Sequence, residues 1–406
     1  MKRIATMFTR GFNKVYMKAL WLAAKVLPIS KPTMFIGKDS SLELCRSIAL
    51  MGIKKLLIVT DAGIVQLGFV EKLSCELEKW SVAVECYSEV TPDPTYDQAE
   101  AAVALYKQTR CGAVLAIGGG SPLDCGKAVA ALATNKKPIK KLTGLLKLRK
   151  APAPLFVIPT TAGTGSEVTV AAVVSDPFTH QKTPILDHKL MPVAAALDAA
   201  LMLGLPPHVT AQTGMDALTH AVESYISGNA TPETDRYALA AVKLISRSLE
   251  TTVSNGKDLE AREDMALASY YAGLAFTKAG LGYTHAIAHT LGSQYGTPHG
   301  LANAVVLPHV LRYSKSSAAP RLAELAETIG IGEGSEDKAD AFISWVRDLQ
   351  LKLGIPETLE AMNKSDIPEI ARQACLEAVW NYPVPKFMEQ KDCEKVVAKL
   401  LPAPHA

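Results

Sequence analysis

The first half of the chain alternates short apolar runs with longer stretches of helical character, and this alternation limits the folds that it can adopt. The runs at 55–60 (KLLIVT), 113–117 (AVLAI) and 155–159 (LFVIP) predict buried strands, each followed by small or turn-forming residues. Strands separated by helices form a parallel sheet, and ligands bind at the carboxyl ends of such strands. We therefore predict an α/β domain over residues 32–203.

The sequence changes character after Leu205, Pro206 and Pro207. Long stretches rich in Ala, Leu and Glu dominate from there on, for example 234–251 and 259–277, and β-branched runs largely vanish. Such a composition favours helices. We predict a helical domain over residues 204–406, and we find no internal repeat or low-complexity linker.

Residues 1–31 form a third, strongly basic segment. The first 38 residues contain eight Lys or Arg, and the first acidic residue is Asp39. On a helical wheel the apolar and basic side chains of this segment fall in separate sectors, which predicts a basic amphipathic helix. Three roles stay open: peripheral contact with an anionic membrane surface, an organelle presequence, or packing on the body of the protein. A secretory signal is disfavoured, because cations divide the apolar positions.

The overall composition narrows the function classes. The 406 residues carry 43 Lys and Arg against 40 Asp and Glu, and the formal charge of +3 is too small for a nucleic-acid-binding protein. The seven cysteines include no CxxC pair, which indicates a reducing compartment, so we expect a cytoplasmic protein. No apolar run approaches the ~18 residues of a membrane span.

A run of three glycines, Gly118, Gly119 and Gly120, directly follows the second predicted strand. Glycines at this point let the backbone approach a phosphate, and helix N-termini bind anions. Ser121 would cap the next helix, and Asp124 completes a Ser-x-x-acid pattern. The loop is not GxGxxG, so a standard Rossmann motif is not indicated, and a tight capped turn without a ligand is the alternative.

A second loop of small residues follows the third predicted strand. It contains Thr160, Thr161 and Thr164 with two glycines, and its hydroxyls and amides suit phosphate, ribose or carboxamide groups. A polar turn that caps a helix is the alternative. Asp61 ends the first predicted strand, where a carboxylate can accept both hydrogen bonds of a ribose diol and repel a 2′-phosphate. From spacing alone, an Asp-initiated turn explains Asp61 equally well.

Histidines and a carboxylate at helical spacing form the most informative pattern. Asp216 and His220 are spaced i, i+4, as are His285 and His289, so each pair shares one face of a helix. A straight helix would put His285 about 21 Å from His299. Three residues between them allow the chain to turn back: Gly292, Gly296 and Pro298. One carboxylate and three imidazoles then suit a divalent metal with a position left open for substrate.

Together these motifs resemble the iron-containing (group III) alcohol dehydrogenases over roughly residues 33–400. The resemblance rests on GGGSPLDCGK at 118–127, PTTAGTGSEVT at 159–169, TGMDALTHAVESY at 213–225 and GYTHAIAHTLGSQYGTPHGLANAVVLPHV at 282–310. It implies a dehydroquinate synthase-like architecture. In this architecture an amino-terminal Rossmann-like parallel-sheet nucleotide domain and a carboxyl-terminal all-α metal-binding domain enclose the active site in a cleft.

The resemblance also implies roles for individual residues. The metal ligands would be Asp216, His220, His285 and His299, and His289 matches a position beside the nicotinamide that acts as a proton relay. The residues that hold the nucleotide would be Gly118, Gly119, Gly120, Ser121, Asp124, Thr160, Thr161 and Thr164. Asp61 matches the acid that holds the adenosine ribose, so NAD is favoured over NADP.

The implied activity is NAD(H)-linked, metal-dependent oxidation of alcohols and reduction of aldehydes by hydride transfer. Asp and His ligands suit Fe²⁺ or Zn²⁺, and the choice of iron follows from the resemblance alone. Ala171, which follows the loop at 159–169, and Phe276 suggest an apolar pocket. We therefore expect primary aliphatic alcohols and aldehydes as the small-molecule substrates, and the resemblance implies a homodimer.

A related activity keeps the same fold. Hydroxyacid-oxoacid transhydrogenases retain a tightly held nucleotide and move hydride between two substrates, and their presequences resemble residues 1–31. Retention of the nucleotide through dialysis would distinguish them. A metal-binding or membrane-surface scaffold without turnover is a third interpretation, which the presence of all four expected ligands disfavours.

Overall fold

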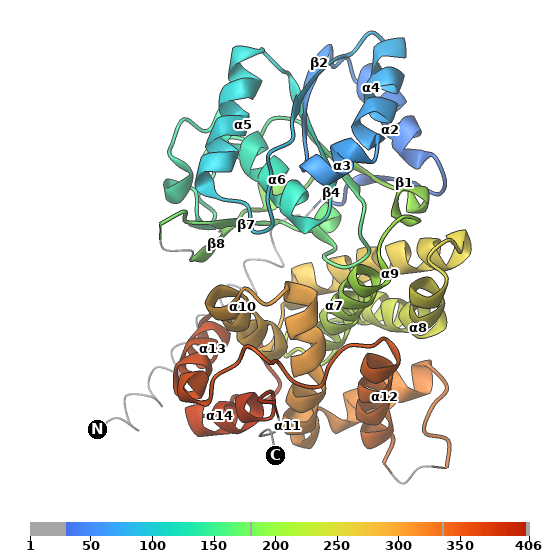
Figure 1. The fold of residues 1–406 in the computed structure, drawn as a ribbon, viewed down its shortest axis with the longest axis vertical. Coiled ribbons are helices and arrows are strands. Elements are labelled where there is room, and N and C mark those ends of the chain that lie inside the picture. Colours follow the sequence, from blue (N-terminus) through green and yellow to red (C-terminus); the bar gives the residue numbers. More distant parts are fainter. Residues whose placement is uncertain (1–29, 179–180, 335–336, 403–406) are drawn as a thin grey trace. The chain divides into compact units, whose positions relative to one another are not determined.

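The computed structural model describes residues 30–178, 181–334 and 337–402 (Figure 1). The chain divides into two compact units. Among the described residues, one unit contains 30–205 together with Gly256–Tyr270, and the other contains Pro206–Asn255 together with the chain from Tyr271. The predicted basic helix of residues 1–31 falls outside the described residues, apart from its last two positions, and stays a prediction.

The first unit is built on a six-stranded sheet in the order β1-β9-β6-β4-β2-β3, with every pair of neighbours parallel. Its strands are β1 (Thr33–Ile36), β2 (Lys55–Val59), β3 (Ala83–Tyr87), β4 (Ala113–Gly118), β6 (Leu155–Pro159) and β9 (Ala194–Leu197). The predicted parallel α/β fold is confirmed, and the three predicted strands are β2, β4 and β6. The pattern missed β1 and β3 because they are partly exposed edge strands, and β9 because it is mostly alanine.

Apolar side chains cover both faces of this sheet. In β2, Leu57 and Val59 face one core while Leu56 and Ile58 face the other, which is the two-residue period of a strand. Helices α5 (Tyr96–Gln108) and α6 (Gly120–Thr134) pack in the first core, and α2 (Ser40–Leu50) and α4 (Phe69–Lys79) in the second (Figure 1). Burial on both faces explains why the predicted strands are continuous apolar runs.

The order in which successive strands are added to the sheet reverses direction between β2 and β4. β3 lies outside β2, whereas the strands after β4 continue the other way, to β6 and β9. In open parallel sheets, ligands bind at the carboxyl ends of the strands beside such a reversal. Asp61, just before the short helix α3 (Ala62–Gln66), and the glycine loop after β4 both lie at this point.

A smaller sheet, which no sequence pattern predicted, contains β5 (Gly144–Leu145), β8 (Lys182–Leu186) and β7 (Ala171–Ser175). β7 and β8 are antiparallel, and β5 joins β8 in parallel. Ala172 and Val174 of β7 share a core with α6, so this sheet is anchored to the helix that follows the glycine loop. Single 3₁₀ turns occur at Ile139–Lys141, Ser166–Val168, His188–Leu190, Ala199–Met202 and, in the second unit, Lys364–Asp366.

The second unit is helical, as predicted. Its helices are α7 (Pro207–Tyr225), α8 (Pro232–Ser254), α9 (Leu259–Ala279), α10 (Tyr283–Tyr295), α11 (His299–Thr328), α12 (Lys338–Lys352), α13 (Ile367–Asn381) and α14 (Gln390–Ala398), and the first part of α9 groups with the sheet unit. α7 is buried along most of its length and packs against α8 and α11. No helix in the described part of the chain is long and apolar enough to cross a membrane.

Candidate functional site

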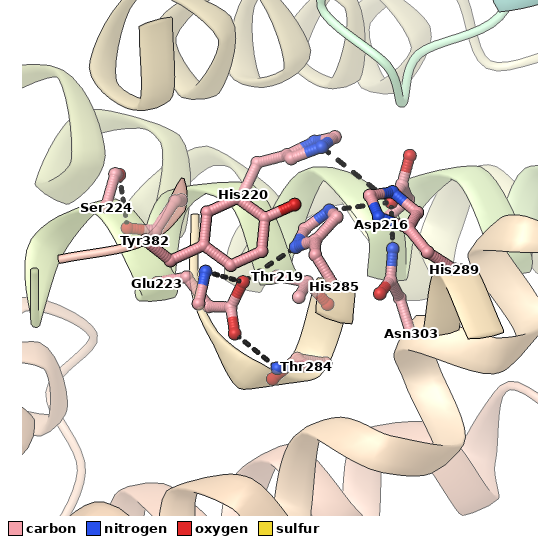
Figure 2. Close-up of polar contacts among 12 residues, drawn as sticks. Asp216, Thr219, His220, Glu223, Ser224, Thr284, His285, His289, Asn303 and Tyr382 are labelled. Atoms are coloured by element: carbon pink, nitrogen blue, oxygen red, sulfur yellow. Dashed lines mark hydrogen bonds and ion pairs between the residues drawn. The ribbon is translucent and has the colours of Figure 1, made fainter. Parts of the chain in front are cut away.

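Helices α7, α10 and α11 bring together the four side chains predicted to bind metal, and Figure 2 labels three of them, Asp216, His220 and His285. Asp216 and His220 lie on successive turns of α7, His285 lies in the first turn of α10, and His299 is the first residue of α11. One ligand atom from each side chain lies within 4.8 Å of the others. The spacing that suggested a shared site therefore corresponds to a real convergence.

The turn between α10 and α11 makes this convergence possible. Gly296 ends α10 in the left-handed conformation, with a φ of 65°, which glycine adopts without the steric cost of a Cβ. Pro298 then immediately precedes α11. Two of the three residues predicted to reverse the chain do so, whereas Gly292 lies inside α10.

Asp216 is at the centre of the cluster. Its Oδ1 lies 4.0 Å from His220 Nε2, 3.8 Å from His285 Nε2 and 3.5 Å from His299 Nε2. Burial by itself would raise the pKa of Asp216, but the three imidazoles and a hydrogen bond from Asn303 outweigh it and lower that pKa. The carboxylate is therefore ionised, and it supplies the negative charge that favours a divalent cation.

The amino end of α10 holds a second buried carboxylate, that of Glu223. Gly282 N donates to its Oε2 at 2.8 Å and Thr284 N to its Oε1 at 2.7 Å. A Cβ on Gly282 would lie 2.7 Å from Glu223 Oε1, so only glycine permits this close approach. Burial raises the pKa of Glu223, and the two backbone donors oppose that rise. Glu223 thereby pairs two backbone amides that the first turn of a helix leaves without partners.

His285 presents a lone pair to the cluster. Its Nδ1 lies 2.7 Å from Glu223 Oε2, which accepts the hydrogen, so Nε2 carries the lone pair. Burial, and then the neighbouring imidazoles, lower the pKa of His285 well below its usual value and keep the ring neutral. Nε2 is buried without a hydrogen-bond partner among the described residues. It faces Asp216 Oδ1 at 3.8 Å, too far for a hydrogen bond, and a divalent cation fits between two such acceptors.

Asn303 closes one side of the cluster. It follows His299 by one turn of α11, and its Nδ2 donates to Asp216 Oδ1 at 2.7 Å (Figure 2). The same Nδ2 lies 3.1 Å from His299 Nε2. The side chain of His299 is 36% exposed, whereas that of Asp216 is 3% exposed. The cluster is therefore sealed at α7 and accessible at His299, which leaves a side from which a substrate can approach.

His289 and Phe276 flank the four ligands. The ring of His289 stacks on that of His299 with centroids 5.3 Å apart, and its Nδ1 lies 2.7 Å from Glu377 Oε1. His289 is thus beside the predicted metal site without being one of its ligands. Phe276 of α9 stacks on His220 with centroids 4.3 Å apart, so an apolar ring lies directly against the cluster.

In the first unit, the two predicted nucleotide loops meet at the carboxyl ends of the neighbouring strands β4 and β6. A Cβ on Gly120 would lie 2.8 Å from Thr164 Cγ2, and a Cβ on Gly119 would lie 3.6 Å from Thr161 Oγ1. The glycines therefore leave the amino end of α6 bare of side chains where the hydroxyls of the second loop approach it. Such a surface of backbone amides and hydroxyls suits a phosphate group.

Gly118 has a backbone conformation that favours glycine. Its φ is 142°, and a Cβ there would lie 2.6 Å from Pro122 Cγ and 3.4 Å from Asp61 Oδ2. Thr160 N donates to Gly118 O at 2.9 Å, and the Thr160 side chain is almost wholly buried. Gly118 thus fixes the path of the loop, whereas Thr160 is buried in the core, unlike the half-buried Thr161 and Thr164.

Asp61 fits both of the interpretations left open by its spacing. Its Oδ1 accepts a hydrogen bond from Ile64 N at 3.0 Å and caps α3, as an Asp-initiated turn would. Its Oδ2 is directed toward Gly118, across the point where the strand order reverses. One oxygen is therefore structural, while the other lies at the reversal of strand order, where open parallel sheets bind ligands.

The predicted capping of α6 is wrong. The helix begins at Gly120 with Gly119 as its N-cap and no side-chain cap, so Ser121 lies inside the first turn. Ser121 Oγ accepts a hydrogen bond from Asp93 N at 3.2 Å instead. The glycines impose little steric restriction and let the helix start early. The uncapped amides of this first turn are donors available to an anion.

Asp124 holds the second loop in place through hydrogen bonds that its carboxylate accepts from other residues of the protein. Its Oδ1 accepts from Ser166 Oγ at 2.8 Å and its Oδ2 accepts from Val173 N at 3.0 Å. Because both oxygens are occupied by protein donors, the geometry supports a role in positioning the loop rather than direct contact with a nucleotide. Asp124 therefore differs from the glycines and threonines with which it was grouped.

Lys127 was not predicted, although a lysine directly before the apolar run 128–133 of the same helix is a signal. Its side chain is fully buried, and Nζ donates to Ser166 O at 2.6 Å, Thr169 Oγ1 at 2.7 Å and Ala171 O at 2.8 Å. Burial lowers the pKa of Lys127 to about 8, against the opposing charges of Asp124 and Glu167. Ala171, the predicted pocket residue at the start of β7, is held through its carbonyl by this ammonium group.

The sequence also did not predict other residues around the candidate metal site. Glu223 follows Asp216 and His220 on one face of α7, so its helical spacing was a usable signal. Asn303 stands in the same i, i+4 relation to His299. No local sequence pattern identifies Glu377, because it contacts His289 from 88 positions away in the chain.

Comparison with known proteins assigns the chain to a family. A family model described as "Iron-containing alcohol dehydrogenase" matches residues 32–199, and one described as "Fe-containing alcohol dehydrogenase family, C-terminal" matches residues 210–401. The chain belongs to the iron-containing alcohol dehydrogenases. It is therefore an oxidoreductase, and the resemblance drawn from its motifs is confirmed.

Relatives of this iron-containing alcohol dehydrogenase align over most of their length. Alcohol dehydrogenase 4 of Schizosaccharomyces pombe is 41% identical over 339 residues, which cover 82% of this chain and 80% of that protein. A solved 1,3-propanediol oxidoreductase is 36% identical with a TM-score of 0.88, covering 91% of this chain and 98% of the other. Sulfoacetaldehyde reductase from Bifidobacterium kashiwanohense, solved in complex with NAD⁺, is 30% identical with a TM-score of 0.83, covering 91% and 97%.

Proposed function

We propose that this iron-containing alcohol dehydrogenase uses NAD and Fe²⁺ to interconvert primary aliphatic alcohols and aldehydes. The observation that carries the proposal is the convergence of Asp216, His220, His285 and His299, with a buried lone pair facing an ionised carboxylate. The names of the three relatives support the substrate class, because each denotes an alcohol or an aldehyde.

The residues present suit both cofactors. Three imidazole nitrogens and one carboxylate oxygen suit Fe²⁺ or Zn²⁺, and membership of the family favours iron. Gly119, Gly120 and the uncapped first turn of α6 would hold the pyrophosphate, with Thr161 and Thr164 beside it. Asp61 favours NAD, since a carboxylate repels the 2′-phosphate of NADP. The relative solved with NAD⁺ supports this choice.

When bound, Fe²⁺ supplies Lewis acidity that makes an alcohol hydroxyl more acidic, and NAD supplies the acceptor for the hydride. The residues of the chain prepare this chemistry. Glu223 orients His285 and burial keeps that ring neutral, so its Nε2 is ready as a ligand. Phe276 excludes water from one side of His220. His289, beside the ligands, accepts the hydroxyl proton during oxidation and returns it during aldehyde reduction.

Reconstitution of the metal-stripped enzyme tests this proposal. The protein is loaded anaerobically with Fe²⁺ or Zn²⁺, and NADH formation is followed with alcohols of increasing chain length. We expect metal-dependent NADH formation that His220→Ala lowers by at least about 100-fold, because it removes a ligand. His208→Ala is the matched control, since His208 is exposed at the start of the same helix.

Other outcomes would redirect the proposal. Absence of NADH with every alcohol and both metals would contradict it. Hydride exchange between a hydroxyacid and an oxoacid without added NAD, by protein that keeps its nucleotide through dialysis, would support the transhydrogenase instead. We also propose that the enzyme is a homodimer. Light scattering on the metal-loaded enzyme measures this oligomeric state directly.

A further inference from the structure

A carboxylate on α13 accepts hydrogen bonds from two ring side chains at one oxygen. Glu377 Oε1 lies 2.7 Å from His289 Nδ1 and 2.6 Å from the hydroxyl of Tyr382. Tyr382 is the first residue after α13 ends at Asn381, and its extended backbone carries the ring back toward the helix. α13 packs against α10, the helix that carries His289. None of these contacts involves the four predicted metal ligands.

The charges around Glu377 determine which groups donate. Burial would raise the pKa of Glu377, but His289 and the hydrogen bond from Tyr382, with a smaller effect of His299, outweigh it and lower that pKa. Burial, followed by the charges of Glu377 and Glu223, raises the pKa of Tyr382 well above its usual value, so its hydroxyl keeps its proton. An ionised carboxylate only accepts hydrogen bonds, so the hydrogen on His289 lies at Nδ1.

The segment after Tyr382 is fixed to the rest of the helical unit. Gly228 N donates to Pro383 O at 2.7 Å. A Cβ on Gly280, which has a φ of 83°, would lie 2.9 Å from Pro383 Cδ, so the chain at 280 and the proline are in close contact. With its neighbour held on two sides, Tyr382 is a rigid donor that holds Glu377 in the conformation that meets His289.

We propose that Glu377, oriented by Tyr382, is a positioning residue that holds His289 in the Nδ1-protonated tautomer. His289 Nε2 is then the atom that exchanges the proton of the alcohol hydroxyl. This rests on the proposed dehydrogenase function. During oxidation the hydroxyl proton passes to Nε2, the ring becomes an imidazolium, and the charge of Glu377 balances it while the hydride leaves with NAD. During aldehyde reduction the same proton returns from Nε2 to the carbonyl oxygen.

The tautomer of His289 is measurable without turnover. The full-length enzyme is labelled with ¹⁵N-histidine and loaded with Zn²⁺, which is diamagnetic, and His289→Gln identifies the signals of the ring. We expect a protonated Nδ1 and an unprotonated Nε2 in the wild type, and a weaker pattern in Tyr382→Phe, which removes the hydroxyl that orients Glu377. Glu377→Ala should lose this pattern, because no acceptor then holds the Nδ1 hydrogen.

The kinetic test separates positioning from binding. Glu377→Gln should lower kcat by about 10- to 100-fold, the range for partners that orient a functional histidine, and change the KM for alcohol by less than about threefold. Glu377→Asp, which keeps the charge, should recover part of the loss. Glu369→Gln is the matched control, because Glu369 lies on the same helix and pairs with Arg372 at the surface.

Failure of the positioning role and failure of the proposed function give different results. An unchanged tautomer in Glu377→Ala, or an unchanged kcat in Glu377→Gln, would overturn the positioning role. If the wild type reduces no NAD with any alcohol, the proposed function fails, and the tautomer spectra still decide what Glu377 does. Thermal unfolding of each variant identifies one that simply fails to fold.

Discussion

His285 Nδ1 lies 2.7 Å from Glu223 Oε2, and the two side chains are 1% and 2% exposed. The bond joins α7 to the first turn of α10 across 62 positions of sequence. It fixes which nitrogen of His285 faces Asp216. A histidine ligand whose second nitrogen is held by a carboxylate is oriented before metal binds, and it is a stronger donor.

Removal of the Glu223 carboxylate should weaken metal binding. We expect Glu223→Gln to reduce metal affinity by about 10- to 100-fold, because the amide loses the charge that orients His285. Glu223→Ala should also lower the free energy of unfolding by about 1–3 kcal/mol, since it leaves buried backbone donors without an acceptor. Chelator competition measures the first effect and denaturant unfolding the second. Glu250→Gln, an exposed acid on α8, is the control, and equal metal retention in all variants would refute the prediction.

The glycine loop permits a direct steric test. Gly120→Ala should weaken NAD⁺ binding by about tenfold or more, equivalent to about 1.4 kcal/mol, because its Cβ would lie 2.8 Å from Thr164 Cγ2. The double variant Gly120→Ala/Thr164→Ser removes that methyl group, keeps the hydroxyl, and should recover part of the affinity. Gly112→Ala is the control, since a Cβ there meets Lys55 O at an ordinary 3.6 Å. Competition of NAD⁺ against fluorescent NADH measures all three, and normal affinity in Gly120→Ala would exclude this loop as the pyrophosphate site.

Asp61 should decide between NAD and NADP. Asp61→Ser removes the charge that repels a 2′-phosphate but keeps a side-chain oxygen to cap α3. We expect the ratio of kcat/KM for NAD⁺ to that for NADP⁺ to fall by about 10- to 100-fold, or about 1.4–2.7 kcal/mol. Glu71→Gln changes an exposed acid of α4 and should leave the ratio unchanged. If the ratio stays the same in Asp61→Ser, the carboxylate does not contact the ribose.

Glu167 should make stability depend on pH. It is 1% exposed, and burial raises its pKa from 4.5 to about 7. Between these values the folded protein holds a proton that the unfolded chain has released, so the contribution of Glu167 to stability falls as the pH rises from 4.5 to 7. Glu167→Gln should therefore gain on the order of 1–3 kcal/mol relative to the wild type between pH 5 and pH 7.5. Lys127 affects stability in a separate pH range. Because its pKa is lowered to about 8 in the folded protein, its contribution to stability rises with pH above pH 8.

Denaturant unfolding of both proteins across this range provides the measurement. A constant difference between wild type and Glu167→Gln from pH 5 to pH 7.5 would mean that the pKa of Glu167 is not raised in the folded state.

Local pattern was sufficient for the central strands of the main sheet, for the helical second half and for the choice of the side chains proposed to bind metal. Apolar runs such as 155–159 are buried on both faces of a strand, and the i, i+4 spacing of Asp216 and His220 places both on one face of α7. These properties depend on neighbours along the chain, so they are visible without a structure. The same reasoning failed for Ser121, because three glycines let α6 begin before the residue that matched a capping pattern.

Only the packing of the helices decided which carboxylates orient the histidines of the candidate site. Glu223 meets His285 across 62 positions and Glu377 meets His289 across 88, and no periodicity connects residues so far apart. Such pairs form because α10 lies against helices from distant parts of the chain, as with α13. Chemical identity along the chain thus selected the residues that we propose bind metal. Burial and long-range contacts decided which nitrogen of each imidazole faces the site, because a buried hydrogen needs an acceptor that only another element can bring.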